Sequence, residues 1–580
     1  MQYRKACSFF GVRAAKSSLV AALAVSCLAG SQIARGDDDD GHLFPGNLLV
    51  SRSVYDNKAS NVVAGTTLLP PNCVGSACAV ATADGTYPTV FNNDLVDASF
   101  GITSKIFLDQ LSSSGWPINS IEVPNSAARG VGPNSDQMVT SFSSKSELAL
   151  NLSTDRQTVT FMGYLAPINA LDVSNSNTPG VVDPTNPVAG QDYRVVAELD
   201  RSGHFRFTKS NAYSGNNGRA AIMNAENGAR LLYTAGNAGN GGNPQPNGII
   251  IGAGAQIMTA AVTPLVHQAP GDPTPVGSFS ITQLGLKADK VGKDTNFRGL
   301  TIFNNVVYMT KGSGGNGINT VYFIDTTGFN SAGAPLACPN GVGVPGPLAT
   351  LPAAPISYNA AVLQTKGVFP YNMCILKGFP TQLAKTSTSS FPFGVWFANA
   401  NTLYVADEGN GTATYNPATN TFTAAAAQTT AGLQKWVFNS GTWTLAYVLQ
   451  AGLELGVPYT IDNYPTGNNP ATGLPWSPAA DGLRNLTGRV NEDGTATIWA
   501  VTSTVSGSGD QGADPNKLVS ITDNLAATSL PAGERFKTVK TARFAEVLRG
   551  VSFTPGTDAH CREDRDHGHG DHDDHGCEHH

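Results

Sequence analysis

The chain has 580 residues, of which 14% are charged, and its formal net charge is −7. A chain without an excess of basic residues lacks the positive surface of general nucleic-acid binders, so we expect no nucleic-acid partner. The 63 glycines and 35 prolines are typical of many short strands joined by polar turns, and they argue against a fold built from long helices.

The N-terminus predicts export. Basic residues occur among the first positions, an apolar run covers 19–29, and a short segment ending at Gly36 follows. This order is typical of a secretory signal peptide, here residues 1–36, cleaved after Gly36. The alternative is lipid attachment at Cys27. No other segment approaches the ~18 apolar residues of a membrane helix, so we expect a secreted protein, periplasmic or extracellular, without a transmembrane segment.

A short pair of apolar strands recurs along the chain, as in 393–397 followed by 402–407. Recurrence of one such unit is typical of a radially repeated β fold. Asn439-Ser440-Gly441 predicts a hairpin turn inside the clearest unit. Five units follow in chain order: 147–152, 158–164, 193–199 and 205–208; then 219–223, 231–234 and 248–258; then 298–303, 306–309 and 320–324; then 394–399, 403–406, 433–438 and 443–449; and finally 486–490, 497–501, 517–522 and 536–541.

The two ends of the chain supply a sixth unit. Residues 549–553 match the first strand of a unit, and the segments 47–54, 105–111 and 120–123 match the other three. Pairing the ends closes the ring and removes exposed strand edges. We therefore predict an all-β, six-bladed β-propeller over 37–556, or seven blades if 345–378 contains another, with insertions at 64–98, 166–190, 325–390 and 450–483 and a tail over 557–580.

The segments 394–397 (Gly-Val-Trp-Phe) and 403–407 (Leu-Tyr-Val-Ala-Asp) resemble the six-bladed propellers of the NHL-repeat and gluconolactonase-like (senescence-marker-protein) group. For its lactonase-like members, the resemblance implies a hydrolase with a divalent cation, such as calcium, held in the channel by carboxylate and Asn oxygens. The matching residues here are Glu147, Asp407 and Asn410, with Glu147 and Asp407 as the catalytic pair. The Asn-Gly entries to the first strands that this family uses are absent. An alternative for Asp407 is a turn residue that caps backbone groups.

Four arginines occupy related positions at the first strands of the units. Aligning those strands makes Arg298, Arg484 and Arg549 equivalent and puts Arg219 one position further on. Guanidinium groups that converge on one channel mouth would attract an anionic ligand. The alternative is that each arginine bridges neighbouring blades through a carboxylate or a backbone carbonyl.

The long loop 450–483 carries Tyr459 and Trp476 among prolines and glycines. Their rings could stack on a sugar or a polymer, or they could cover the blade beneath. The partner predicted from these features is an unspecified small molecule, glycan or protein, and we expect the chain to be a monomer.

Six cysteines are left after removal of the leader. Six cysteines permit fifteen connectivities, and pairing in chain order gives Cys73–Cys78, Cys338–Cys374 and Cys561–Cys577.

The last residues of the chain are rich in histidine and aspartate. Imidazole and carboxylate groups are ligands for zinc, copper and nickel, so the tail is predicted to bind one of these metals. The alternative is a solvated tail with only adventitious affinity. The predicted ligands are His567, His569, His572, His575, His579 and His580.

Three functions are compatible with these features. The first is a secreted propeller that binds a ligand or partner at its channel mouth, where the arginines would suit an anion, and carries an accessory metal-binding tail. The second is a metal-dependent hydrolase of the lactonase or esterase type. The third is a structural protein of the envelope or matrix.

Overall fold

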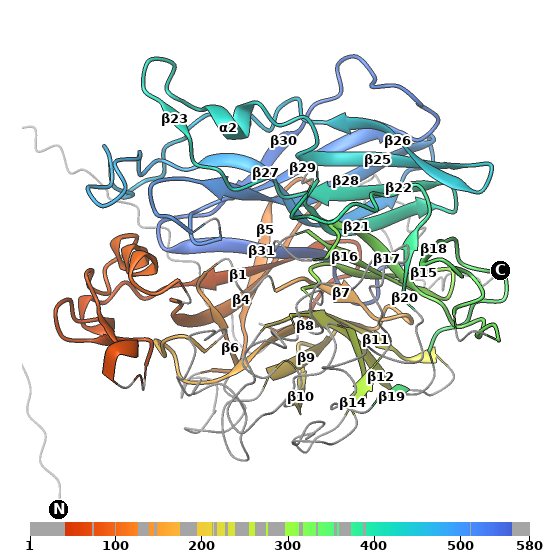
Figure 1. Cartoon of the computed structure of the whole chain (residues 1–580), viewed down its shortest axis with the longest axis horizontal. Helices are drawn as coiled ribbons and strands as arrows, with labels where there is room; N and C mark the ends of the chain where they lie inside the picture. The colour runs from red at the N-terminus through yellow and green to blue at the C-terminus, as the bar shows by residue number, and fades with distance from the viewer. Residues whose placement is uncertain are drawn as a thin grey trace, which may run out of the picture. The chain divides into compact units, whose positions relative to one another are not determined.

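Antiparallel strands make up most of the regular structure (Figure 1). The structure is a computed structural model that describes residues 41–558, except for 72, 74, 99, 126–137, 144–147, 174–193, 211–212, 214–216, 227–229, 238–254, 261–273, 277–295, 313–316, 332–333, 353–355, 359–372, 387–389 and 511. The predicted leader and nearly all of the predicted tail lie outside the described residues. In the described ranges, the helical segments are one turn of α-helix, α2 (Thr423–Ala426), and 3-10 turns at Ala59–Asn61, Gly75–Ala77 and Thr89–Leu95. Among the described residues, no helix has the length and apolar character needed to cross a membrane.

Two four-stranded antiparallel sheets follow one another along the chain, and both match the predicted units. The hairpin between β25 (Gly432–Asn439) and β26 (Thr442–Leu449) forms as predicted, because Ser440 and Gly441 both adopt positive φ angles, 50° and 77°. Such angles give the turn a twist that suits the flanking strands. The first sheet contains β21 (Pro392–Asn399), β22 (Thr402–Asp407), β25 (Gly432–Asn439) and β26 (Thr442–Leu449). The second contains β27 (Ala479–Val490), β28 (Thr495–Val505), β29 (Lys517–Asn524) and β30 (Lys537–Thr541).

A third sheet corrects the boundary of a predicted insertion. It contains β15 (Leu300–Phe303), β16 (Val306–Lys311), β17 (Thr320–Ile324) and β20 (Met373–Leu376), with β18 (Val342–Gly343) parallel to β20. The strand β20 lies inside the segment 325–390, which was predicted as an insertion. The disulfide between buried Cys338 and Cys374 ties this strand to the segment that precedes β18. Residues predicted to form a loop therefore complete a sheet.

The largest sheet joins the two ends of the chain. Strand β1 pairs along its whole length with β31, from Leu48 opposite Phe553 to Val54 opposite Glu546. Figure 1 shows the two strands side by side, and the predicted closure is confirmed. The sheet runs in the order β10 (Phe205–Ser210), β9 (Arg194–Asp200), β8 (Thr158–Leu165), β6 (Met138–Ser141), β4 (Thr103–Leu111), β1 (Leu48–Val54) and β31 (Glu546–Phe553), with β5 (Pro117–Glu122) on β4 and β7 (Asn151–Leu152) on β8.

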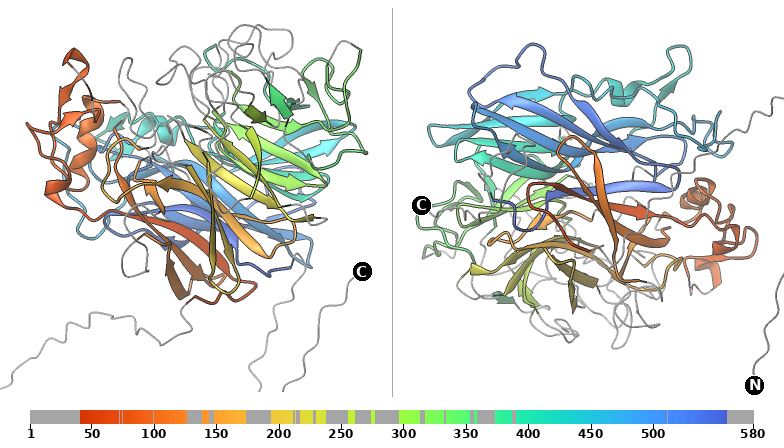
Figure 2. Two further views of the ribbon diagram at one scale, coloured as in Figure 1. Left: turned by 90° about the horizontal axis from the view of Figure 1, so that it is seen from below. Right: turned by 180° about the vertical axis from the view of Figure 1, so that it is seen from behind.

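These four sheets of four or more strands form a propeller-like ring (Figures 1 and 2). A three-stranded sheet, whose first strand contacts β8 and β15, consists of β11 (Gly218–Asn224), β12 (Leu231–Gly236) and β13 (Ala255–Thr259). Three short pairs complete the regular structure of the described residues: β2 (Leu68–Leu69) with β3 (Ala79–Val80), β14 (Thr274–Val276) with β19 (Ile356–Tyr358), and β23 (Tyr415–Asn416) with β24 (Thr421–Phe422).

Apolar side chains fill the spaces between neighbouring sheets. Tyr404 and Leu433 of one sheet pack against Ile498 and Ile521 of the next in a single buried cluster. The same holds at the closure, where Val50 of β1 packs with Val501 of β28. Because burial of apolar surface is the main favourable term in folding, contacts of this kind hold the sheets together around the ring.

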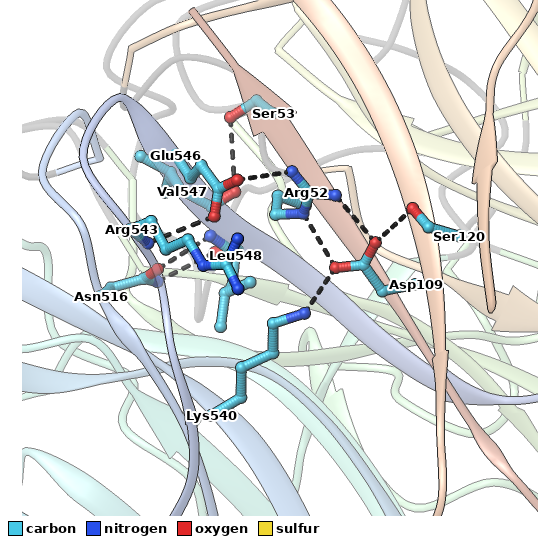
Figure 3. Close-up of polar contacts among 10 residues, drawn as sticks. All are labelled: Arg52, Ser53, Asp109, Ser120, Asn516, Lys540, Arg543, Glu546, Val547 and Leu548. Carbon is cyan, nitrogen blue, oxygen red and sulfur yellow. Dashed lines mark hydrogen bonds and ion pairs between the residues drawn. The ribbon is translucent and has the colours of Figure 1, made fainter. Parts of the chain in front are cut away.

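An ion-pair network crosses the closure of the ring (Figure 3). Arg52 of β1 contacts Asp109 of β4 through two nitrogens, at 2.8 and 3.0 Å, and Glu546 of β31 at 2.8 Å. Lys540 of β30 reaches the same Asp109 at 2.7 Å. Burial alone would raise the pKa of Asp109, but Arg52 and then Lys540 outweigh it and hold that pKa well below its usual range. The network therefore links both ends of the chain to the sheet of β30.

Candidate functional site

The four arginines predicted to line a channel mouth are buried, with exposed fractions between 2% and 8%. Arg298 precedes β15, Arg484 lies on β27, Arg549 on β31 and Arg219 on β11. A buried guanidinium requires partners, because the transfer of an unpaired charge out of water is costly. The contacts of each arginine therefore show what it does in the folded chain.

Two of the arginines enclose one aromatic ring. The guanidinium carbons of Arg298 and Arg484 lie 5.4 and 5.3 Å from the ring centroid of Phe393, the second residue of β21. Arg484 also forms an ion pair with Glu408, with Nε 3.3 Å from Oε2. Phe393 belongs to the sheet between the two that carry the arginines, so this arrangement joins three consecutive sheets.

The other two arginines contact different segments. Arg549 donates from Nε to Ser53 Oγ at 3.0 Å and from Nη1 to the carbonyl of Ser143 at 2.8 Å. Arg219 donates to the side chain of Asn296 and to the carbonyl of Phe297, the latter at 3.4 Å. The structure brings Arg298 and Arg484 together and holds Arg219 and Arg549 in separate contacts. Arg549 thereby joins the two ends of the chain, and Arg219 joins β11 to the segment before β15.

Asp407 ends strand β22 and is fully buried. Its carboxylate accepts four hydrogen bonds, from Ser390 Oγ, Gln434 Nε2 and the backbone N–H groups of Phe391 and Gly409, at 2.8 to 3.0 Å. Burial raises its pKa to about 6, although these hydrogen bonds act in the opposite direction. The carboxylate thus organises the turn after β22. Glu147, its predicted catalytic partner, lies outside the described residues.

A second buried carboxylate, Asp481 of β27, was not predicted. It accepts hydrogen bonds from Gly411 N at 2.7 Å and from Gln428 Nε2 at 2.6 Å. Burial raises its pKa to about 7, and the nearby charges of Glu408 and Asp407 add to the effect. Gly409 is required beside it, because its φ is +83° and a Cβ there would lie 2.5 Å from Asp481 Oδ2. No regular spacing connects Asp481 with Asp407, so the sequence offered no signal for this pair.

Within the described part of the chain, no group of three or more His, Cys, Asp or Glu side chains is arranged to hold a metal ion. The histidines predicted as tail ligands, His567 to His580, lie beyond that part, as do Cys561 and Cys577. The pairs Cys73–Cys78 and Cys338–Cys374 are disulfides, as predicted.

The predicted ligand-binding residues of the loop 450–483, Tyr459 and Trp476, pack against other parts of the chain. Trp476 is buried in a cluster with Tyr464 and Tyr87, and the hydroxyl of Tyr459 donates to the carbonyl of Pro515 at 2.8 Å. The ammonium group of Lys517 lies 3.9 Å from the centroid of the Tyr459 ring. The Trp476 ring is therefore buried, whereas the Tyr459 ring is partly exposed.

The segment 55–100, here called the lobe, contributes about half of that cluster. Tyr55, Leu69, Val90 and Phe91 are all buried in it, and Tyr87 donates to the carbonyl of Ala513 at 2.7 Å. Figures 1 and 2 show the lobe as a red-to-orange projection beside the ring. The sequence marked 64–98 only as an insertion. Its run of aromatic and apolar residues was the signal that it is anchored on the ring.

No family model and no curated protein sequence match the chain. Among solved structures, it is similar to the N-terminal domain of Nup159, with 7% identity over 71% of this chain and 92% of that one and a TM-score of 0.24. A complex of S. cerevisiae Dbp5 with Nup159, Gle1, IP6 and ADP gives 7% identity over 67% and 77%, with a TM-score of 0.22. NanB sialidase from Streptococcus pneumoniae gives 9% identity over 89% and 79%, with a TM-score of 0.19. Likenesses at these TM-scores carry no argument, so the fold rests on the strand pairing of the chain itself.

Proposed function

We propose that the chain is an exported, six-bladed β-propeller that binds a protein partner through the lobe. The partner is a folded protein with an apolar patch bordered by basic residues. In this proposal the four arginines belong to the scaffold, and an accessory tail at 557–580 binds zinc, copper or nickel.

A count of six blades is supported by the contacts between the first strands of neighbouring sheets. Asn485 Nδ2 donates to the carbonyl of Arg549 at 2.9 Å and joins β27 to β31. Asn151 Nδ2 donates to the carbonyl of Ala221 at 3.1 Å and joins β7 to β11. The largest sheet would then supply two blades, one on each side of β6, and β11–β13 would supply a third. Together with the three remaining sheets, this makes six blades. The first strand of each blade would then line the ring.

The observation that carries the binding proposal is a pair of exposed apolar side chains on a rigid support. Leu68 of β2 lies directly opposite Val80 of β3, and the two are 49% and 45% exposed. The disulfide Cys73–Cys78 closes the connection between these strands, and the next residue, Leu69, is fully buried. Exposed apolar groups on a preorganised surface are typical of protein interfaces.

The charge of the lobe indicates the kind of partner. Its sequence contains four aspartates, Asp56, Asp84, Asp94 and Asp97, but one basic residue, Lys58. Complementary charge around an interface favours the correct partner and speeds association. An apolar patch with a basic rim would therefore match the lobe.

The experiment is site-specific photocrosslinking in the producing cells, with the photoreactive group at position 68. Position 348 serves as a control, because Leu348 is 83% exposed but lies outside the lobe. We expect one heterologous protein to be crosslinked from position 68 and not from 348. Binding of that purified protein should weaken at least about tenfold in the double variant Leu68→Asp, Val80→Asp, equivalent to about 1.4 kcal/mol.

Two results would contradict the proposal. Crosslinks from position 68 to a second copy of the chain alone would make the lobe a self-association surface. Binding that is unchanged in the double variant would show that the crosslinked protein only passes near the lobe. The exposed control Leu530→Asp should leave binding unchanged.

A further inference from the structure

A lysine and an aspartate face each other in the apolar space between two sheets. Lys435 lies on β25 and Asp523 on β29, and both side chains are fully buried. The Lys435 Nζ atom is 2.9 Å from Asp523 Oδ2. Leu433, Ile521 and Phe536 belong to the apolar cluster around them. Two charges held in such a place bear a large desolvation cost.

Two tyrosines hold the carboxyl group of Asp523 in place. Tyr447 donates its hydroxyl to Asp523 Oδ1 at 2.6 Å, and Tyr404 donates to Oδ2. Lys435 Nζ is positioned by the carbonyls of Asn524 and Ala527, at 2.6 and 3.0 Å. The ammonium and carboxyl groups are thus held side by side by groups from several segments, as a reaction between them requires.

A second acidic group, Glu534, stands beside this pair. Its Oε1 atom accepts a hydrogen bond from Asn524 N at 3.1 Å. Burial, followed by the neighbouring Asp523, raises the pKa of Glu534 to about 7. A carboxyl group that retains a proton near neutral pH can donate and accept protons during a reaction.

We propose that Lys435 and Asp523 condense in the folded chain to form an amide crosslink between their side chains. A bond forms between Lys435 Nζ and Asp523 Cγ, and the bond between Cγ and Oδ2 breaks. Oδ2 leaves as water with two of the three protons of the Lys435 ammonium group, and one proton stays on the amide nitrogen. The step requires no oxidant, reductant or other reactant.

Each neighbouring group has a role in this step. Glu534 relays protons from Lys435 to the departing oxygen, and Tyr447 stabilises negative charge on Oδ1 as the tetrahedral intermediate forms. The product replaces two buried charges with one neutral amide, which removes their desolvation cost. The crosslink would join the sheet of β21–β26 to the sheet of β27–β30 covalently, independently of any partner bound by the lobe.

Peptide mapping of the purified full-length protein tests the proposal. After reduction and alkylation, trypsin should yield one branched peptide in which 386–484 is joined to 518–535, lighter than their sum by one water molecule. The peptides 386–435 and 518–535 should be absent, since an acylated lysine is not cleaved. Recovery of both free peptides from the native protein, with no branched species, would overturn the proposal and leave a noncovalent ion pair.

Two variants separate the chemistry from folding. Lys435→Met should release 518–535 as a free peptide and leave 386–484 unbranched, as a control for missed cleavage. Glu534→Gln should keep the fold, measured by circular dichroism, and lower the crosslinked fraction at least tenfold in freshly made protein. Complete crosslinking in Glu534→Gln would refute the proton relay through Glu534.

Discussion

Arg484 illustrates how burial decides the role of a single residue. Its ion pair with Glu408 is almost completely shielded from water, with side-chain exposures of 7% and 5%. Removing the cation from such a pair leaves a buried charge without its partner, which is more damaging than loss of an exposed contact. We expect Arg484→Ala to lower the free energy of unfolding by about 3 kcal/mol.

Chemical denaturation of Arg484→Ala, together with titration of sulfate as an anionic probe, checks this expectation. The exposed control Lys537→Ala should change the stability by less than about 0.5 kcal/mol. A variant that keeps its stability but loses sulfate affinity would show that Arg484 binds an anion.

Asp407 and Asp481 predict how stability depends on pH. Their pKa values are raised to about 6 and about 7, largely by burial, with the charge of Glu408 acting on both and Arg484 paired to that glutamate. The folded state therefore binds more protons than the unfolded state between the unfolded pKa, about 4, and these values. The stabilising effect of protonation is present at the lower end of this window and is lost as the pH rises through it.

Thermal unfolding should accordingly show a higher Tm at about pH 5 than at about pH 8. Asp481→Asn, which cannot ionise, should flatten this dependence, whereas the exposed Asp462→Asn should not. A Tm that rises toward the higher pH would contradict the assignment.

Among the elements, the pairing of β1 with β31 determines whether the ring closes. Arg52 contacts both Asp109 and Glu546, and the Asp109 side chain is only 4% exposed. We expect Arg52→Met to lower the free energy of unfolding by about 3 kcal/mol, because Asp109 would keep only Lys540 as a cationic partner. Amide exchange should accelerate mainly in residues 48–54 and 546–553.

A matched control is available at the surface. Arg535 pairs with Glu454 at 3.5 Å, and these side chains are 64% and 60% exposed. Exposed pairs contribute little, so Arg535→Met should change stability by less than about 1 kcal/mol. Equal effects of the two variants would mean that the network of Figure 3 is not important for closure.

At the scale of the whole molecule, the sequence predicts that the tail, residues 557–580, is not part of the propeller. Its composition predicts zinc, copper or nickel binding by the histidines between 567 and 580. The full chain should therefore bind more of these metals than a chain ending at Gly556, measured by elemental analysis after dialysis. Equal stoichiometry would refute metal binding by the tail, and an unchanged Tm in the shortened chain would confirm that the ring does not need it.

Much of the strand pattern could be predicted from the sequence, because alternation and turn chemistry act over a few residues. The hairpin at Ser440 and Gly441 is an example. The strand β20 could not be placed in this way, since its pairing with β17 follows a long connection that also contains the partner of its disulfide, Cys338. The hydrogen-bond partners of Asp407 could not be predicted either, because its four donors come from three separate segments.

The sequence by itself determined most of the strand units and the pairing of the two ends. Both could be predicted because alternation of apolar residues and the strands left over at each end are visible in the order of residues. Only the tertiary structure decided that the four arginines are buried, and that Lys435 meets Asp523. Those outcomes depend on which distant side chains share a buried space. The cost of removing a charge from water then determines which of them must pair.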